Sequence, residues 1–129
     1  MANRLYQNRM LYTSSINQPS EKDLDKSYKG KAKIEDAYFF EKIENGKIVR
    51  RYFDKDKITS HESNNGLNIS VLSEKAGFSC LTITGLESIC SFLSETNCLG
   101  RDLSFLRGKE VTMYSDGIRL FGLSPQEDK

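Results

Sequence analysis

The residues best suited to chemistry in this sequence are one histidine, three cysteines and a pair of aspartates. His61 stands beside Glu62 in a polar stretch, SHESNNG. A general base needs a partner that positions it, and the sequence shows none for His61. We therefore interpret His61 as a solvated loop side chain, and a small enzyme that uses His61 is the second alternative for function.

Metal binding has little support in the spacing of the available ligands. Zinc sites usually take cysteine and histidine ligands as close pairs, and Cys80, Cys90 and Cys98 form no such pair. Asp54 and Asp56 lie in a lysine-rich run without the glycine and glutamate of an EF-hand loop. The sequence therefore predicts no metal site, and the odd number of cysteines favours reduced thiols.

Cofactor and nucleophile motifs are also missing from the sequence. Neither GxGxxG nor GxxxxGK[ST] occurs, so no phosphate-binding loop is indicated. No GxSxG motif marks a nucleophilic serine. We expect no catalytic residue and no cofactor, and a protein that is not an enzyme.

Composition sets the general class of the protein. The chain has 129 residues, of which 37% are hydrophobic and 29% charged, which is typical of one soluble globular domain. The net charge of +1 gives no bulk attraction to nucleic acid or to an anionic membrane. No apolar run is long enough to span a bilayer and no signal peptide is evident, so we expect a cytoplasmic protein that does not bind membranes.

The aromatic and basic residues of one predicted hairpin suggest a binding surface. Arg50 and Arg51 share this hairpin with the rings of Phe39, Phe40, Tyr52 and Phe53, and such cations and rings are the ingredients of a platform for single-stranded nucleic acid. Neighbouring acidic residues dilute this charge, so nucleic acid is the alternative partner. Tyr and Arg are also enriched in protein interfaces, and a non-enzymatic protein-binding protein is the first hypothesis.

Candidate partner-binding residues are the tyrosines, arginines and one phenylalanine of the N-terminal segment and of two hairpins. An exposed strand edge or the N-terminal segment would also allow a homodimer. The candidates are Tyr6, Arg9, Tyr12, Phe40, Arg50, Arg51, Tyr52, Tyr114 and Arg119.

Three hairpins are predicted to position these residues. Asn45-Gly46 predicts a tight turn between residues 31–43 and 47–53, with Phe39 opposite Tyr52, Phe40 opposite Arg51, Glu41 opposite Arg50, Tyr38 opposite Phe53 and Ile43 opposite Ile48. The strict alternation of residues 67–71, with a return over 78–84, predicts the second hairpin. The first hairpin, residues 31–43 and 47–53, is expected either to be buried on one side or to project from the domain.

A helix and a third hairpin are predicted to follow. Thr84 and Glu87 have the spacing of a capping box, after which Leu86, Ile89, Cys90 and Leu93 form one apolar stripe. Asn97 is a candidate left-handed cap at its end. Asp116-Gly117 predicts a tight turn that sets Tyr114 opposite Arg119 and Thr112 opposite Phe121, and places Val111, Met113, Ile118 and Leu120 on a core face.

These elements predict an α+β fold with a mostly antiparallel sheet. About six strands in three hairpins and one helix on one face are expected, in the order β-β-β-β-α-β-β. Residues 1–28 show no clean period and are expected to be an arm or linker, with a candidate edge strand at Met10 to Thr13 and a linker or single helical turn after Ser20. Residues 29–124 then form the domain and residues 125–129 a polar tail.

The end of the chain resembles one loosely defined group of proteins. An apolar helix followed by LRGKEVTMYSDGIRLFGLS is similar to the ends of small accessory proteins of phages and other mobile elements. The resemblance rests on a Gly-Lys pair, an Asp-Gly turn and alternating apolar residues. It implies a protein that binds a host or phage macromolecule, for example an inhibitor of a host defence complex, and it transfers no functional residue.

Overall fold

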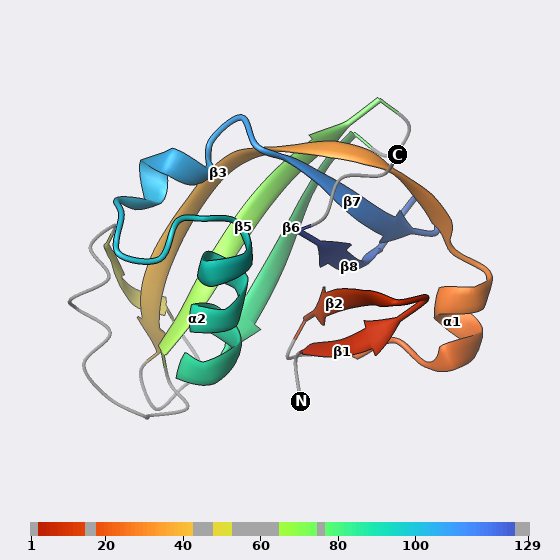
Figure 1. The fold of residues 1–129 in the computed structure, drawn as a ribbon, viewed down its shortest axis with the longest axis horizontal. Coiled ribbons are helices and arrows are strands. Elements are labelled where there is room, and N and C mark those ends of the chain that lie inside the picture. Colours follow the sequence, from red (N-terminus) through yellow and green to blue (C-terminus); the bar gives the residue numbers. More distant parts are fainter. Residues whose placement is uncertain (1–2, 15–17, 43–47, 53–64, 75–76, 126–129) are drawn as a thin grey trace.

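The long strand β3 (Tyr28–Lys42) arches across the molecule in the computed structural model (Figure 1). β7 (Glu110–Ser115) pairs with its beginning, while β5 (Asn65–Ser73) and β4 (Ile48–Tyr52) pair with the remainder. Among the described residues the sheet is antiparallel and has eight strands. Their order is β1 (Asn3–Tyr6), β2 (Arg9–Thr13), β8 (Leu120–Ser124), β7, β3, β5 and β6 (Gly77–Thr84), with β4 as a further partner of β3. The predicted α+β class with a mostly antiparallel sheet is confirmed, but the number and order of the elements differ.

The structure describes residues 3–14, 18–42, 48–52, 65–74 and 77–125. The remaining elements are two N-terminal strands, two helices, a 3-10 helix and two further strands. They are β1 (Asn3–Tyr6), β2 (Arg9–Thr13), α1 (Glu21–Asp25), β6 (Gly77–Thr84), α2 (Leu86–Glu95), the 3-10 helix η2 (Leu103–Leu106) and β8 (Leu120–Ser124).

The predicted register of β3 with β4 is largely confirmed. Phe39 pairs with Tyr52, Phe40 with Arg51 and Glu41 with Arg50. The ladder then shifts by one residue, so that Ile48 pairs with Lys42 and not with the predicted Ile43. The Asn45-Gly46 turn and the partner predicted for Tyr38, Phe53, lie outside the described residues.

The second predicted hairpin is confirmed as β5 with β6. Leu67 pairs with Ile83 and Ile69 with Leu81, and all four side chains are buried. Phe78 lies on the opposite face and is exposed, as the alternation of side chains along a strand requires.

The residue predicted to cap the start of helix α2, Thr84, is not the cap in the structure. Thr84 is still part of β6 and pairs with Gly66. Gly85 is the residue before the helix, with φ of 92° and no side-chain hydrogen bond to cap it. This conformation favours glycine, so the chain turns from strand to helix at Gly85, which occupies the cap position predicted for Thr84. At the other end Asn97 has φ of 60°, as expected for a left-handed cap.

The turn of the third hairpin is longer than predicted. Ser115 pairs with Leu120 and Tyr114 with Gly122, so four residues separate the strands where a two-residue Asp-Gly turn was expected. The Asp116 carboxylate accepts bonds from the backbone of Ile118 (2.8 Å) and Arg119 (2.6 Å), which closes this wider turn. Ile118 is consequently 91% exposed at the tip, and its predicted core position is wrong.

The N-terminal segment is part of the sheet and not a loose arm. Gln7 and Asn8 both have positive φ and turn β1 back onto β2. β2 in turn pairs with β8, with Tyr12 opposite Leu123. The candidate strand predicted at Met10 to Thr13 is confirmed as β2, although it lies between β1 and β8 and not at an edge. β1 was not predicted, because polar residues obscure any period in this segment.

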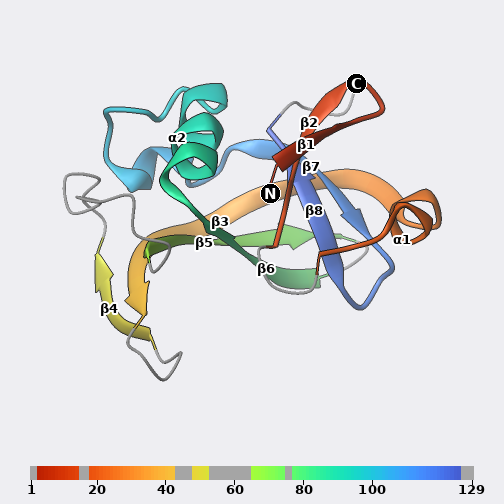
Figure 2. The ribbon, with the colours of Figure 1, turned by 90° about the horizontal axis from the view of Figure 1, so that it is seen from below.

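The main core lies inside the curve of the sheet and is covered by α2. Ile89, Phe92 and Leu93 of α2 pack with the inward side chains of β3, β5, β6 and β7. Val111 and Met113 are buried there as predicted, Leu120 is partly buried, and the side chain of Leu86 is not described. Seen from below, α2 lies on one side of β3, β5 and β6, whereas β4 lies at the far end of β3 on the other side (Figure 2).

Candidate binding surface

A groove of about 790 Å³ runs beside the beginning of β3. Its lining includes six consecutive residues, Tyr28 to Lys33. Side chains of a strand alternate between two faces, so consecutive residues line one groove only where the groove follows the edge of the strand. The groove therefore gives access to backbone as well as to side chains.

Among the described residues this edge is open, because the pairing of β5 with β3 stops before the beginning of β3. On one side, β7 pairs with the whole stretch from Tyr28 to Lys33. On the other side, the ladder with β5 ends at the pair Lys33 and Leu72. No strand in the described part of the chain pairs with Gly30 to Ala32 on that side, which leaves room for an added strand.

The inner wall of the groove is apolar and partly bare. Ala32 and Met113 are buried residues of this wall, and Gly30 contributes no side chain. A Cβ atom built on Gly30 would have no other atom within 4 Å, and Gly30 is not among the glycines with positive φ. The space above Gly30 is therefore open to a side chain from outside.

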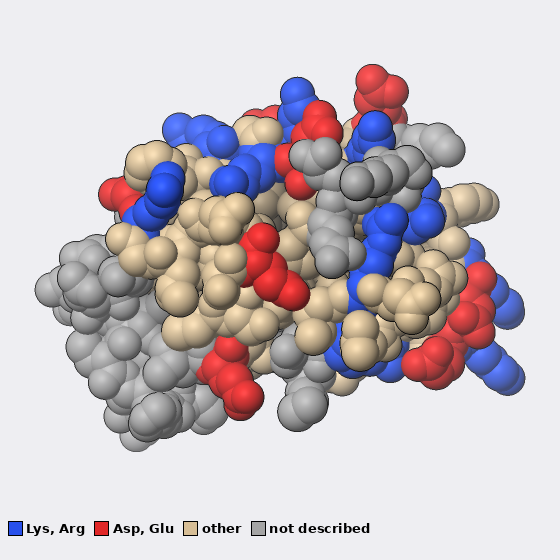
Figure 3. Space-filling model, viewed as in Figure 1, with Lys and Arg blue, Asp and Glu red and all other residues tan. Residues whose placement is uncertain are grey.

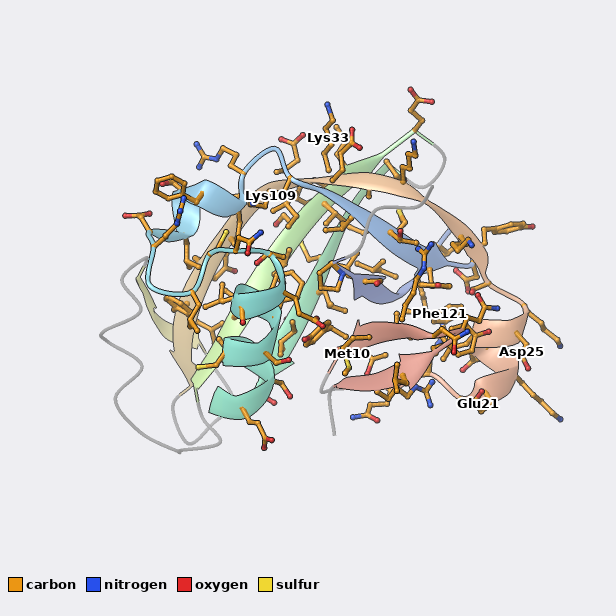
Figure 4. All side chains as sticks on the ribbon, viewed as in Figure 1. Met10, Glu21, Asp25, Lys33, Lys109 and Phe121 are labelled. Carbon is orange, nitrogen blue, oxygen red and sulfur yellow. The ribbon has the colours of Figure 1, made fainter. Side chains whose placement is uncertain are left out.

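Charged side chains line the same groove. Lys29, Lys31 and Lys33 alternate along β3 and are all exposed on its outer face. Glu110 of β7 stands opposite Lys33, while Thr112 stands opposite Lys31. Lys33 lies at the top of the molecule in Figure 4, and Figure 3 shows cations and acids interspersed on that part of the surface.

Exposed apolar side chains line part of the groove. Of the seven large hydrophobic residues exposed in the described part of the chain, two line the groove and two more neighbour a lining residue. Tyr28 (66% exposed) and Leu72 (46%) line the groove, Phe78 (63%) pairs with Leu72, and Ile118 follows the lining residue Gly117. An apolar rim around an open strand edge is a feature of protein-binding surfaces.

The turn that carries Ile118 is held in one conformation. Gly117 donates its backbone N–H to the Ser115 hydroxyl over 2.9 Å. The backbone N–H groups of Arg119 and Ile118 donate to the Asp116 carboxylate, which lowers the pKa of Asp116 below its ordinary value. The Arg119 guanidinium lies 4.9 Å from the centroid of the Phe121 ring and 3.9 Å from an Asp23 oxygen. Ile118 is thus presented by an ordered turn.

Three of the predicted partner-binding tyrosines are buried and join elements of the fold. The Tyr6 hydroxyl donates to Asp25 over 2.9 Å, and its ring meets Tyr114 edge to face at 5.5 Å. Figure 4 places Asp25 and Phe121 beside the β1–β2 hairpin. The Tyr12 hydroxyl contacts Ser91 and Glu95 of α2. All three tyrosines are thus engaged in contacts within the fold.

The other predicted residues are scattered over the structure. Arg9 donates to the Thr112 hydroxyl over 3.0 Å, and Arg119 lies over Phe121 where Tyr114 was the predicted ring. Phe40 is buried and lies over Gly66. The backbones of Arg50, Arg51 and Tyr52 form β4, but their side chains lie outside the description, as does His61 altogether.

Of the rings proposed as a nucleic-acid platform, the structure describes the side chains of Phe39 and Phe40 but not that of Tyr52. Phe39 and Phe40 are buried, so neither ring is available for a base to stack on. Cys80, Cys90 and Cys98 are free thiols. Among the described residues no group of three or more His, Cys, Asp and Glu side chains is arranged to hold a metal ion.

The sequence analysis did not identify the groove itself. The feature of the sequence that could have indicated the groove is the alternation of lysine with glycine or alanine over residues 29–33. That alternation predicts a half-exposed strand, but only the lengths of β3 and β5 show that one edge is open.

Comparison with known proteins found no matching family model, no matching curated protein and no matching solved structure. No helix in the described part of the chain has the length and apolar character needed to cross a membrane.

Proposed function

We propose that this protein is a non-enzymatic binding protein that recognises another protein through the groove beside β3. The observation that carries the proposal is the exposure of Tyr28 and Leu72 in the lining of a groove beside an edge of β3 that no described strand covers. Exposed apolar side chains scattered singly need no explanation, but two of them in one groove, with Phe78 and Ile118 next to lining residues, support a protein interface.

The ordered turn at Ile118 supports the same function. Turn tips usually carry small or polar residues, whereas this one presents a bulky β-branched side chain. Because the turn is already fixed by its hydrogen bonds, an interface that used Ile118 would lose little conformational entropy on binding.

The polar contacts inside the fold have a structural explanation. Tyr12, Ser91 and Glu95 join β2 to α2, and Tyr6 and Asp25 join β1 to α1. None of these five residues lines the groove. The resemblance of the closing segment to phage and mobile-element proteins makes a host defence complex the first class of partner to test.

Two matched double variants test the proposed function. Tyr28→Ser with Ile118→Ser removes apolar groups at the groove, and Leu5→Ser with Leu99→Ser removes apolar groups exposed elsewhere. Exposed substitutions of this kind change the free energy of unfolding by about 0.5 kcal/mol or less, so both variants should fold. The tagged full chain is purified from its source cell, and the proteins that accompany it are quantified by mass spectrometry.

We expect the groove variant to lose a protein that the wild type and the control variant both retain. The proposal is wrong if the groove variant retains the same set of proteins, or if wild type enriches none. Loss of the same protein from both variants would also contradict it, because the groove would then have no special role.

A further inference from the structure

We propose that the partner segment is an extended strand that alternates acidic and apolar residues and pairs with β3 at Lys31. This inference rests on the proposed function and names the chemistry of the partner at the same groove.

The backbone of Lys31 faces the open side. The Ile34 N–H donates to Lys109 over 2.9 Å, and the Ile34 carbonyl accepts from Gly108 over 2.8 Å, so the polar groups of Ile34 point toward the β7 side. Hydrogen-bonding groups alternate in direction along a strand, so those of Lys33 and Lys31 point the other way. Lys33 already pairs with Leu72 of β5. Lys31 is the next position at which an added strand would continue this ladder.

The two faces of β3 specify the side chains of that strand. Lys29, Lys31 and Lys33 are exposed on the outer face, so alternate side chains of an added strand would lie beside ammonium groups. Asp or Glu is favoured at those positions because opposite charges on neighbouring strands attract. The intervening side chains would lie over Gly30 and Ala32, where the open apolar wall favours aliphatic groups.

A second copy of the same edge fits this surface poorly. Antiparallel pairing of two β3 strands about Lys31 would place Lys31 opposite its own copy and Lys29 opposite Lys33. Like charges directly opposite one another destabilise a sheet, and edge lysines are a common device against self-pairing. Glu35, Glu74 and Glu110 also line the groove, so the preference for an acidic strand is local to Lys31, whose neighbour on β7 is the uncharged Thr112. At that position the lysines disfavour a second copy of the edge and favour an acidic partner.

The test uses the isotope-labelled full chain and two blocked synthetic peptides. One peptide alternates Glu and Val, and the control peptide alternates Lys and Val. Binding is followed by the amide resonances of the protein at low and at moderate salt. We expect the Glu-Val peptide to shift the resonances of Gly30, Lys31 and Leu72, to bind more weakly as salt rises, and to bind more tightly than the control peptide.

Two variants of Lys31 separate charge from backbone pairing. Lys31→Gln removes the charge and keeps the N–H, so we expect binding roughly two- to fivefold weaker. Lys31→Pro removes the N–H as well, and since that N–H faces away from β7 the ladder with β7 keeps its bonds. Binding of the Glu-Val peptide should then be lost. Gly30→Leu, which fills the open space, should block the peptide through a different change in case the proline variant is unfolded.

Four results would overturn the inference. They are equal binding of the two peptides, resonance shifts confined to residues outside the groove, equal binding by Lys31→Pro and Lys31→Gln, and self-association that Lys31→Pro abolishes, which would assign the edge to a second copy. If no peptide binds while the Tyr28 and Ile118 variant still loses its cellular partner, the inference is wrong and the proposed function stands. If that variant also retains its partners, both are wrong.

Discussion

The hydroxyl of Tyr12 donates a hydrogen bond of 2.7 Å to the carboxylate of Glu95. Tyr12 belongs to β2 and Glu95 is the last residue of α2, so the bond joins the N-terminal hairpin to the helix that covers the core. Because the single hydroxyl proton of Tyr12 goes to Glu95, the Ser91 hydroxyl, 2.6 Å away, donates to the Tyr12 oxygen. The Tyr12 ring also meets Phe92 edge to face at 5.2 Å.

Removing this hydroxyl should destabilise the protein. Tyr12→Phe keeps the ring and loses the bonds to Ser91 and Glu95, and since the exposed Glu95 can turn to water, we expect a loss of about 1 to 2 kcal/mol in the free energy of unfolding. Urea denaturation measures the change. Tyr28→Phe is the matched control, because the Tyr28 side chain is exposed, and it should change stability by less than about 0.5 kcal/mol. An equal effect of the two variants would contradict the role of the Tyr12 hydroxyl.

The same tyrosine predicts how stability changes at alkaline pH. Burial, more than any other cause, raises the pKa of Tyr12, and burial followed by the bond to Asp25 raises the pKa of Tyr6. The native state therefore keeps these protons at a pH where the unfolded chain releases them. Their contribution is complete below the ordinary pKa of about 10 and declines as pH rises from there toward the native values. Urea midpoints measured across this range should fall less steeply for Tyr12→Phe than for wild type, and parallel curves would contradict the prediction.

Gly66 should not tolerate even a methyl group. A Cβ atom at Gly66 would overlap the ring of Phe40, which is buried. Forcing an extra carbon into packed structure typically costs about 1 to 3 kcal/mol, and we expect that loss for Gly66→Ala. Gly30→Ala is the control, since its Cβ meets open space, and it should leave stability unchanged or raise it slightly. Thermal unfolding compares them, and a harmless Gly66→Ala would show that the Phe40 ring is not held against this strand.

Leu93 and Ile118 form a pair of tests for the extent of the core. Both were predicted core residues. Leu93 is 2% exposed, as predicted, whereas Ile118 is exposed at a turn. Leu93→Ala should cost about 2 to 5 kcal/mol of unfolding free energy, because the cavity would lie under α2. Ile118→Ala should change it by less than about 0.5 kcal/mol. A loss well under 1 kcal/mol at Leu93 would show that the helix does not pack as described.

Patterns that depend on local chemistry were predictable from the sequence. The alternation of residues 67–71 identified β5, and Asn45-Gly46 fixed most of the register between β3 and β4. Asn97 was identified as a helix cap because asparagine tolerates positive φ.

The predictions failed where one local signal competed with another. Thr84 has the sequence of a cap, but its pairing with Gly66 keeps it in the sheet, and Gly85 makes the turn instead. Asp116 resembles the first residue of a two-residue turn, but its carboxylate accepts two backbone bonds and widens the loop. In the first place a strand pairing, and in the second two side-chain-to-backbone hydrogen bonds, determined the structure, and the spacing of apolar residues in the sequence predicts neither.

The candidate groove was less predictable than the fold. Its lysines and Gly30 are visible in the sequence. Its open edge arises because β5 ends at Ser73, and its last pair with β3 is Leu72 with Lys33, whereas β3 begins at Tyr28. Such a difference in strand length depends on partners far apart in the chain. The predicted site residues followed aromatic and basic composition, and composition does not separate a buried tyrosine such as Tyr12 from an exposed one such as Tyr28.

The pairing of β2 with β8 ties the first strands of the chain to the last. Tyr12 and Thr13 pair with Leu123 and Gly122, so this hairpin pairs with β8 only after β8 has been synthesised. Before that point the apolar side chains of β2 lack this partner strand, and contacts between residues so far apart in sequence slow folding. A nascent chain stopped before β8 would therefore display Leu11 and Tyr12 to chaperones, and completion of β8 is the step that ends this exposure.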